Sequence, residues 1–285
     1  MFRVQPVSEI VSQVGEGPLW HSQTSSVFWV DIPGKVIHSA ELRTGKSSSI
    51  KTPMMVGAVA LAQDNTLIAA TQSGFAKISL DGKNLSKIEE FLASDMRMND
   101  GKVDPAGRFW AGSLALDFER NRGSLYVLEK DSTRSTAIEN LTLSNGMGWS
   151  PDERYFYFID SIPGTIFRYN FDSSSGTISN KTVLVEFDSK RGIPDGLCIT
   201  SDGLILIALW DGGRLELYEP SGKKLEEFVL PVNRPTSCCF AGDDFSTLIV
   251  TTASEDIDGT LEPLAGRILA LSDTGLSGLP TYRYG

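Results

Sequence analysis

Histidine and cysteine are scarce in this chain, which has two histidines and three cysteines in 285 residues. His21 and His38 cannot build a multi-histidine zinc site, and neither lies in a motif with a nucleophilic serine. The cysteines are Cys198 and the adjacent pair Cys238-Cys239, which is not the pattern of a disulfide framework. We expect small buried thiols in a reducing, cytoplasmic environment.

Long apolar runs and phosphate-binding motifs are also missing. The longest apolar run, around Leu204 to Trp210, is far too short to span a bilayer, and the N-terminus lacks the apolar core of a signal peptide. There is no phosphate loop and no dinucleotide fingerprint. The net charge of −10 argues against a nucleic-acid partner, so cations or small neutral molecules are the expected partners.

Helical periodicity is absent as well, and what replaces it is a unit that recurs six times. Each unit begins with what we call an anchor residue, continues through a short apolar stretch and a turn, and then enters a bulky apolar run. The anchors lie between 40 and 50 residues apart, the length of a four-stranded propeller blade, and they are Glu16, Val56, Asn99, Asn145, Asp195 and Thr236.

The runs that follow the anchors have the composition of buried strands. Val27 to Val30 and Tyr155 to Phe158 are examples, rich in β-branched and aromatic residues. The pattern predicts an all-β chain: a single domain, residues 1–285, folded as a six-bladed β-propeller with four-stranded blades. Little sequence remains after Leu271 for a last strand, so we expect the N-terminal segment Val4 to Ile10 to close the ring. An all-β sandwich would not explain six units of this length.

Four of the six anchors are carboxylates or carboxamides: Glu16, Asn99, Asn145 and Asp195. Singly, Asn-Gly and Pro-Asp-Gly read as common turns. Together they occupy one phase of the repeat, and equivalent positions in a propeller face its central channel. Buried carboxylates without a counter-ion would repel one another, so we expect a divalent cation among them.

An all-oxygen set of Glu16, Asn145 and Asp195 favours calcium, magnesium or manganese over zinc. Val56 and Thr236 are expected to form the open side of this site.

Several segments that contain these residues resemble one known family. They are Gly15 to Trp20, Arg97 to Lys102, Leu143 to Ser150, Ile193 to Gly196, Val103 to Arg108 and Arg234 to Ser237. In order and composition they are similar to the signature segments of the SMP-30/gluconolactonase/luciferin-regenerating-enzyme-like family, across essentially the whole chain. The resemblance implies a six-bladed propeller and a metal-dependent lactonase that hydrolyses sugar lactones such as gluconolactone.

The resemblance also implies roles for individual residues. Glu16, Asn145 and Asp195 would bind one divalent cation, with calcium expected first and magnesium, manganese or zinc as alternatives. Arg97 and Asn99 would bind substrate hydroxyls. Counting without gaps places a further hydroxyl-binding carboxylate at Asp117, where this chain departs from the family by carrying aspartate in place of glutamate.

The chemistry expected of these parts is hydrolysis of a small-molecule lactone. Asp195 is the expected general base, because one carboxylate oxygen can bind metal while the other accepts a proton from water. The planar donor fork of Arg97 and the amide of Asn99 suit ring and hydroxyl oxygens. Loops at Met54-Met55 and Asp117 to Arg122, with Trp149 and Trp210, are candidate walls.

Three alternatives stay open at this point: a phosphotriesterase, a hydrolase of non-sugar lactones or esters, and a non-catalytic calcium-binding regulatory protein. In each case we expect no nucleic-acid or membrane partner, and a monomer or weak homo-oligomer.

Overall fold

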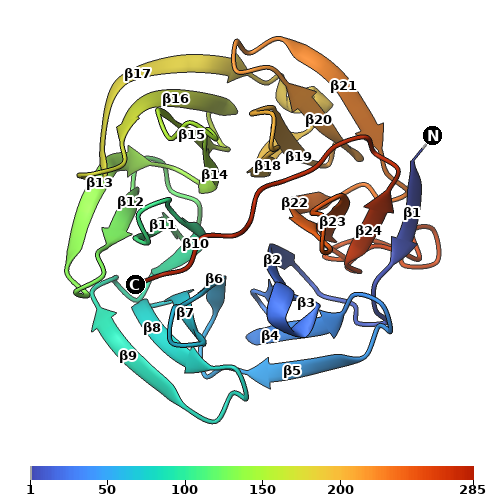
Figure 1. Cartoon of the computed structure of the whole chain (residues 1–285), viewed down its shortest axis with the longest axis horizontal. Helices are drawn as coiled ribbons and strands as arrows, with labels where there is room; N and C mark the ends of the chain where they lie inside the picture. The colour runs from blue at the N-terminus through green and yellow to red at the C-terminus, as the bar shows by residue number, and fades with distance from the viewer. Residues whose placement is uncertain (1) are drawn as a thin grey trace.

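A computed structural model describes residues 2–285, and these form six antiparallel four-stranded sheets arranged as blades around a ring (Figure 1). The predicted six-bladed β-propeller is confirmed. Two short 3-10 helices, η1 (Ser22–Thr24) and η2 (Ser189–Arg191), lie in loops. Within residues 2–285 no helix has the length and apolar character needed to cross a membrane.

The blades follow the repeat of the sequence, and each begins at its innermost strand. Blades one to three are made of β2 (Gly15–His21), β3 (Ser26–Asp31), β4 (Val36–Glu41) and β5 (Ser47–Lys51); β6 (Val56–Leu61), β7 (Thr66–Thr71), β8 (Gly74–Ser79) and β9 (Leu85–Glu90); and β10 (Met96–Val103), β11 (Phe109–Ala115), β12 (Gly123–Leu128) and β13 (Arg134–Leu141).

The remaining three blades have the same order of strands. They are made of β14 (Ser144–Trp149), β15 (Tyr155–Asp160), β16 (Thr165–Asp172) and β17 (Thr177–Glu186); β18 (Ile193–Ile199), β19 (Ile205–Trp210), β20 (Arg214–Tyr218) and β21 (Lys224–Val229); and β22 (Pro235–Ala241), β23 (Thr247–Thr252), β24 (Leu269–Ser272) and β1 (Arg3–Pro6).

The ring closes where the two ends of the chain pair. β1 lies antiparallel to β24, with Arg3 opposite Ser272 and Pro6 opposite Leu269. The prediction that the N-terminal segment supplies the missing outer strand is therefore confirmed, although the strand ends at Pro6 rather than at Ile10. Pairing the ends leaves β24 without an open edge, which would otherwise offer unpaired backbone groups to another chain.

Each innermost strand has a register irregularity at or next to its anchor. The shifts lie between Glu16 and Leu19, Val56 and Ala58, Met98 and Gly101, Ser144 and Met147, Pro194 and Leu197, and Pro235 and Ser237. A β-bulge inserts residues into one strand and re-aims a side chain. The repeated bulge thus gives the anchors a backbone environment that the rest of each blade lacks.

Glycine follows the anchors Asn145 and Asp195, where the innermost strand of the next blade leaves no room for a Cβ. A Cβ added at Gly146 would lie 2.6 Å from the backbone nitrogen of Leu197, and one at Gly196 would lie 2.1 Å from Ser237 Oγ. Neither contact is compatible with a side chain, so only glycine fits. Asn145-Gly146 and Asp195-Gly196 are consequently parts of β14 and β18, not the hairpin turns that such dipeptides usually indicate.

A buried ion pair ties the third blade to the fourth. Arg108 Nε lies 2.6 Å from Asp104 Oδ2, and both side chains are almost wholly buried. The indole N–H of Trp110 donates to the same carboxylate at 3.0 Å, and Arg108 Nη2 donates to the carbonyl of Ser173 at 2.6 Å. Because every charge is paired and hydrogen-bonded, the pair can be accommodated in an otherwise apolar region.

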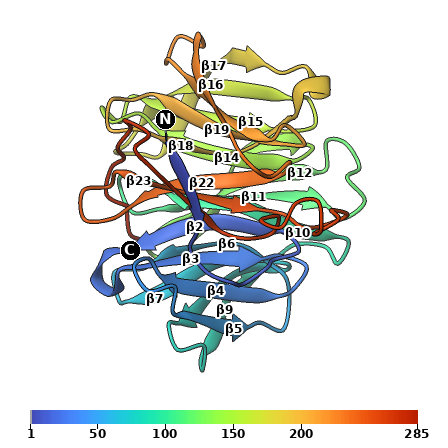
Figure 2. The ribbon, with the colours of Figure 1, turned by 90° about the vertical axis from the view of Figure 1, so that its right-hand side faces the viewer.

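The last residues cross one end of the ring, and we call residues 273–285 the C-terminal strap (Figure 1). Seen edge-on, the C-terminus lies at one side of the ring (Figure 2). Backbone hydrogen bonds fasten the strap to blades six, five, two and three through Phe245, Ser201, Leu61 and Gly107. Tyr284 is buried, and its hydroxyl donates to the carbonyl of Glu129 at 2.7 Å.

Candidate functional site

A cavity with a volume of about 310 Å³ lies at the end of the channel opposite the C-terminal strap. The strap contacts residues that follow the innermost strands, such as Ser201 after β18. The cavity is lined instead by residues that precede innermost strands, such as Val14 and Leu143, and by residues that follow second strands, such as Ile32 and Ile162. The strap and the cavity therefore lie at opposite ends of the channel.

Five of the six residues predicted from the sequence to bind metal or substrate line this cavity. Glu16, Asn99, Asn145 and Asp195 come from β2, β10, β14 and β18 and are buried, and Arg97 comes from β10 and is partly buried. The structure thus brings together residues spread over 180 positions of the sequence, because each occupies the same place in its blade.

The two remaining anchors do not border an open side, and that expectation is wrong. Val56 is buried in an apolar cluster with Leu19 and Leu67. Thr236 is fully buried, and its hydroxyl donates to the carbonyl of Gly15. These positions pack the ring together, because each side chain is satisfied by its neighbours instead of facing the cavity.

Hydrogen bonds connect the polar floor of the cavity. Asn99 Nδ2 donates to the carbonyl of Ser144 at 2.8 Å and to Asn145 Oδ1 at 3.2 Å. Arg97 Nη1 donates to Asn99 Oδ1 at 2.6 Å and to the carbonyl of Met98 at 3.0 Å. On the other side of Asn145, Nδ2 lies 3.0 Å from Ser161 Oγ, and that hydroxyl lies 2.6 Å from the carbonyl of Pro194.

On the floor of the cavity, buried carboxyl groups outnumber positively charged groups. Burial, followed by the nearby Asp195 and Asp100 carboxylates, raises the pKa of Glu16 well above its usual value. Burial and Asp100 likewise raise the pKa of Asp195. Burial lowers the pKa of Arg97 to about 10, so its guanidinium stays charged at neutral pH. A bound cation would relieve this arrangement, since opposite charge favours the ionised carboxylates.

The atoms on the floor that can bind a metal ion are oxygens, and they come from two carboxyl groups and the amide side chains. Within residues 2–285 no group of three or more histidine, cysteine, aspartate or glutamate side chains is disposed to hold a metal ion. The set Glu16, Asn145 and Asp195 includes an asparagine, so only two of its members are of those types. Two carboxylates and one amide oxygen are ligands that calcium, magnesium and manganese accept.

Comparison with known proteins identifies the family to which the chain belongs. Residues 14–254 match the model of the SMP-30/Gluconolactonase/LRE-like region. Regucalcin of Danio rerio is 34% identical over 289 residues, covering 99% of this chain and 98% of that protein. The chain belongs to the SMP-30/gluconolactonase/LRE-like family.

Solved structures agree with this family in fold. A luciferin-regenerating enzyme superposes with a TM-score of 0.92 at 27% identity, covering 100% of this chain and 99% of that one. A regucalcin of Agrobacterium tumefaciens, described as a calcium-binding protein, gives a TM-score of 0.95 at 24% identity and covers 100% and 98%. The latter similarity is one of fold.

This member of the SMP-30 family does not bring Asp117 to the cavity. The Asp117 carboxylate is exposed and accepts a hydrogen bond from the backbone N–H of Glu119 at 3.0 Å. The following residue, Phe118, lines the cavity in its place. Among the candidate walls Trp210 also lines it, whereas Trp149 packs in an aromatic cluster with Trp110 and Phe156.

Ser161 and Glu255 line the cavity although the sequence did not single them out. Both follow the second strand of a blade, β15 and β23. They lie one and three residues after those strands, at unequal distances from their anchors, so the repeat does not identify them.

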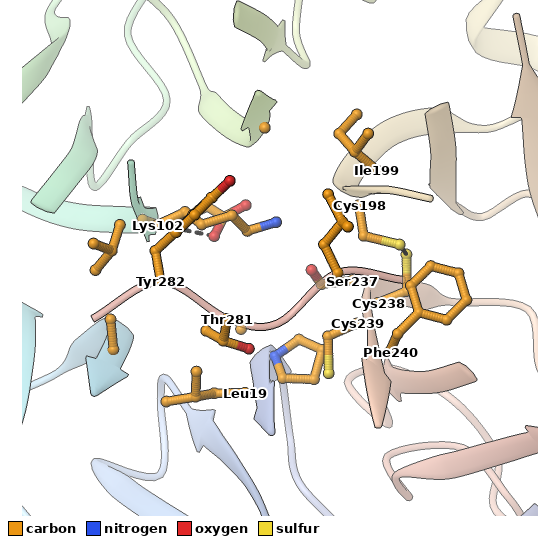
Figure 3. Close-up of a pocket in the computed structure, with 18 of the residues that line it drawn as sticks. Leu19, Lys102, Cys198, Ile199, Ser237, Cys238, Cys239, Phe240, Thr281 and Tyr282 are labelled. Carbon is orange, nitrogen blue, oxygen red and sulfur yellow. Dashed lines mark hydrogen bonds between the residues drawn. The ribbon is translucent and has the colours of Figure 1, made fainter. Parts of the chain in front are cut away.

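A second, smaller cavity of about 130 Å³ lies beneath the strap, and its lining shares no residue with the first (Figure 3). Lys102 and Tyr282 face the cysteines across it, and Lys102 Nζ donates to the carbonyl of Leu197 at 2.9 Å. The sulfurs of Cys198 and Cys238 lie 3.3 Å apart as free thiols. As expected, the three cysteines form no disulfide framework, and His21 and His38 are buried outside both cavities.

Proposed function

We propose that this protein is a metal-dependent lactonase that hydrolyses a lactone to its hydroxy acid. The observation that carries the proposal is the meeting of Glu16, Asn145 and Asp195 with Arg97 and Asn99 in one cavity. Glu16, Asn145 and Asp195 form an acidic, oxygen-rich floor. Beside it lie the guanidinium of Arg97 and the amide of Asn99. Membership of a family whose description includes gluconolactonase supports the same reaction class.

Glu16, Asn145 and Asp195 would hold one divalent cation, with calcium the first candidate and magnesium, manganese or zinc the alternatives. When bound, such a cation supplies a Lewis acid for the lactone carbonyl and lowers the pKa of a water molecule. The raised pKa values of Glu16 and Asp195 support the assignment, because two buried acids without a counter-ion resist ionisation.

Asp195 accepts the proton of the attacking water in this mechanism. Its carboxylate has two oxygens, so one would remain for the proton when the other binds a cation. As water adds to the carbonyl carbon and the ring C–O bond breaks, the ring oxygen takes up a proton and becomes the hydroxyl of the product. The buried position of Asp195 keeps bulk water away from this exchange.

Arg97 and Asn99 bind and orient the substrate. The Arg97 guanidinium remains charged at neutral pH and presents a planar set of donors to carbonyl or ring oxygens. Asn99 is fixed by three hydrogen bonds, so little conformational freedom is lost when it meets the substrate. The expected third contact, from Asp117, does not reach the cavity, so the proposal here extends to lactones as a class.

The test is a pH-indicator assay of acid release. The protein is treated with a chelator and assayed with an aldonolactone, an unsubstituted lactone and a phosphotriester, then assayed again with calcium, magnesium, manganese and zinc. We expect release from at least one lactone that is lost on chelation and restored by a divalent cation. Metal-dependent cleavage of the phosphotriester alone would favour a phosphotriesterase. Cation binding without turnover of any substrate would favour a non-catalytic calcium-binding protein.

A further inference from the structure

The lining of the larger cavity divides into a polar floor and an apolar wall. The floor is formed by the innermost strands and carries Glu16, Asn99, Asn145 and Asp195. The wall lies toward the loops that follow the second strands and is formed by Val14, Ile32, Phe118, Leu143, Ile162, Ile193 and Trp210. A substrate whose ester group reaches the floor therefore has its substituents against hydrocarbon.

Phe118 is the most exposed part of this wall, with half of its surface accessible. It lies in the loop after β11 with φ at +58°, a left-handed conformation that bulky side chains rarely adopt. Its backbone N–H donates to the carbonyl of Ala115 at 2.9 Å, so a closed turn holds this conformation.

Ile162 stands at the same mouth from the loop after β15 and is 37% exposed. Trp210 completes the wall from the end of β19, with the Arg234 guanidinium 4.8 Å from its ring centre. Arg234 is itself held by Asp211 at 2.6 Å. Uncovered apolar side chains gathered at the mouth of a cavity favour an apolar ligand group.

Hydrogen-bonding groups are few on this wall. The Asp117 carboxylate is turned back onto its own loop, and Glu255 Oε1 accepts from Gln13 Nε2 at 3.3 Å. The hydroxyls of a sugar ring placed against this wall would lose water and gain few partners beyond the remaining acceptor sites of the Glu255 carboxylate, which disfavours binding. An alkyl or aryl substituent would lose only unfavourable contact with water.

We propose that the preferred substrates are lactones with an aliphatic or aromatic substituent, bound against Phe118, Ile162 and Trp210, in preference to polyhydroxylated sugar lactones. This inference rests on the lactonase function proposed above. A volume of about 310 Å³ accommodates a lactone ring with a short side chain.

Three six-membered lactones test the proposal on the cation-loaded protein: glucono-1,5-lactone, δ-valerolactone and δ-nonalactone, which carries a butyl group. Each buried methylene should raise kcat/KM roughly four-fold until the wall is covered, so the butyl lactone should exceed the unsubstituted one by at least about ten-fold. It should also exceed the sugar lactone. A preference for the sugar lactone would overturn this inference and leave the lactonase proposal standing.

Phe118→Asn is the decisive variant, because asparagine tolerates the left-handed backbone and removes the aromatic wall. It should lower kcat/KM for the butyl lactone at least about five-fold more than kcat/KM for δ-valerolactone. Val183→Asn is the matched control, since Val183 is an exposed apolar side chain on β17, away from the cavity. Equal effects of Phe118→Asn on both lactones would contradict the proposal.

Ile162→Ser provides a second variant that does not depend on the Phe118 loop, and it should also weaken the preference for the butyl lactone. Binding gives a readout without turnover, using calorimetry on Asp195→Asn: δ-nonalactone should bind more tightly than glucono-1,5-lactone, and the reverse order would overturn the inference. Failure of all three lactones to be hydrolysed with any cation would overturn the lactonase proposal itself.

Discussion

The hydroxyl of Ser161 fixes which atom of the Asn145 amide points into the cavity. Ser161 Oγ lies 2.6 Å from the carbonyl of Pro194, which can only accept, so the single hydroxyl proton is used there. Toward Asn145, 3.0 Å away, Ser161 must then accept, and the amide nitrogen of Asn145 lies on that side. The amide oxygen, the atom a cation would need, is left facing the floor.

Replacing Ser161 by alanine should therefore weaken cation binding. Loss of a group that orients a ligand typically lowers metal affinity about 10- to 100-fold, and we expect Ser161→Ala to fall in that range by titration calorimetry. Ser201→Ala is a suitable control, because the Ser201 hydroxyl lies 2.8 Å from that of Ser277 in the strap, at the other end of the channel. An unchanged affinity in Ser161→Ala would show that Ser161 does not orient the Asn145 amide for the cation, and that the hydrogen bond from Asn99 is enough.

Asp195→Asn should nearly abolish turnover while keeping the fold. The amide has almost the same shape but cannot accept a proton, and general-base catalysis is worth about 100- to 10,000-fold. The measurement is kcat for the best lactone substrate at saturating cation, with circular dichroism to verify folding. Unimpaired turnover would show that another group accepts the proton.

The chelated protein should become less stable as the pH rises. Burial raises the pKa values of Glu16 and Asp195 above their unfolded values of 4.5 and 3.8. Their contribution to stability is then fully present below the unfolded values and is lost as the pH rises through the folded ones. A divalent cation should restore the melting temperature most at high pH, where both carboxylates are ionised.

The buried histidines act in the opposite direction over part of this range, because burial lowers the pKa values of His21 and His38 from 6.5. The double variant Glu16→Gln/Asp195→Asn isolates the carboxyl contribution, since it keeps the histidines and removes both acids. Thermal melts of the chelated wild-type and variant proteins should diverge with rising pH, the variant being the more stable. Parallel profiles would contradict the prediction.

Asp104→Ala should destabilise the ring without touching the cavity. The substitution leaves Arg108 buried without its carboxylate and removes the acceptor of the Trp110 indole. Breaking a buried pair by removing one partner costs about 3–5 kcal/mol, which urea unfolding would measure. Asp131→Ala, in an exposed turn where the carboxylate accepts from Thr133, is the control and should change stability little.

The sequence was sufficient for the ring and for the floor of the cavity. The repeat predicted six blades and ring closure, and the shared phase of Glu16, Asn145 and Asp195 predicted their meeting, because position within a blade determines position around the channel. Val56 and Thr236 share that phase but point into packed surroundings, since the direction of a side chain at a bulge depends on neighbours that the pattern does not include.

The wall of the cavity could not be predicted in the same way. Asp117 and Phe118 are adjacent, and only a left-handed φ at Phe118 decides which of them faces the cavity. That angle belongs to a loop outside the repeat. The loops that join the strands of a blade vary in length and conformation, so counting along the chain placed the carboxylate where the structure has a phenyl ring.

The C-terminal strap restricts where small molecules enter and leave the central channel. It lies across the far end of the channel, and the cavity beneath it shares no lining residue with the larger one. In the proposed lactonase, substrate and product would then enter and leave through the same opening. A bound product molecule would block entry of the next substrate, so the hydroxy acid should act as a competitive inhibitor. Turnover would then depend on how quickly the product is removed from the surrounding solution.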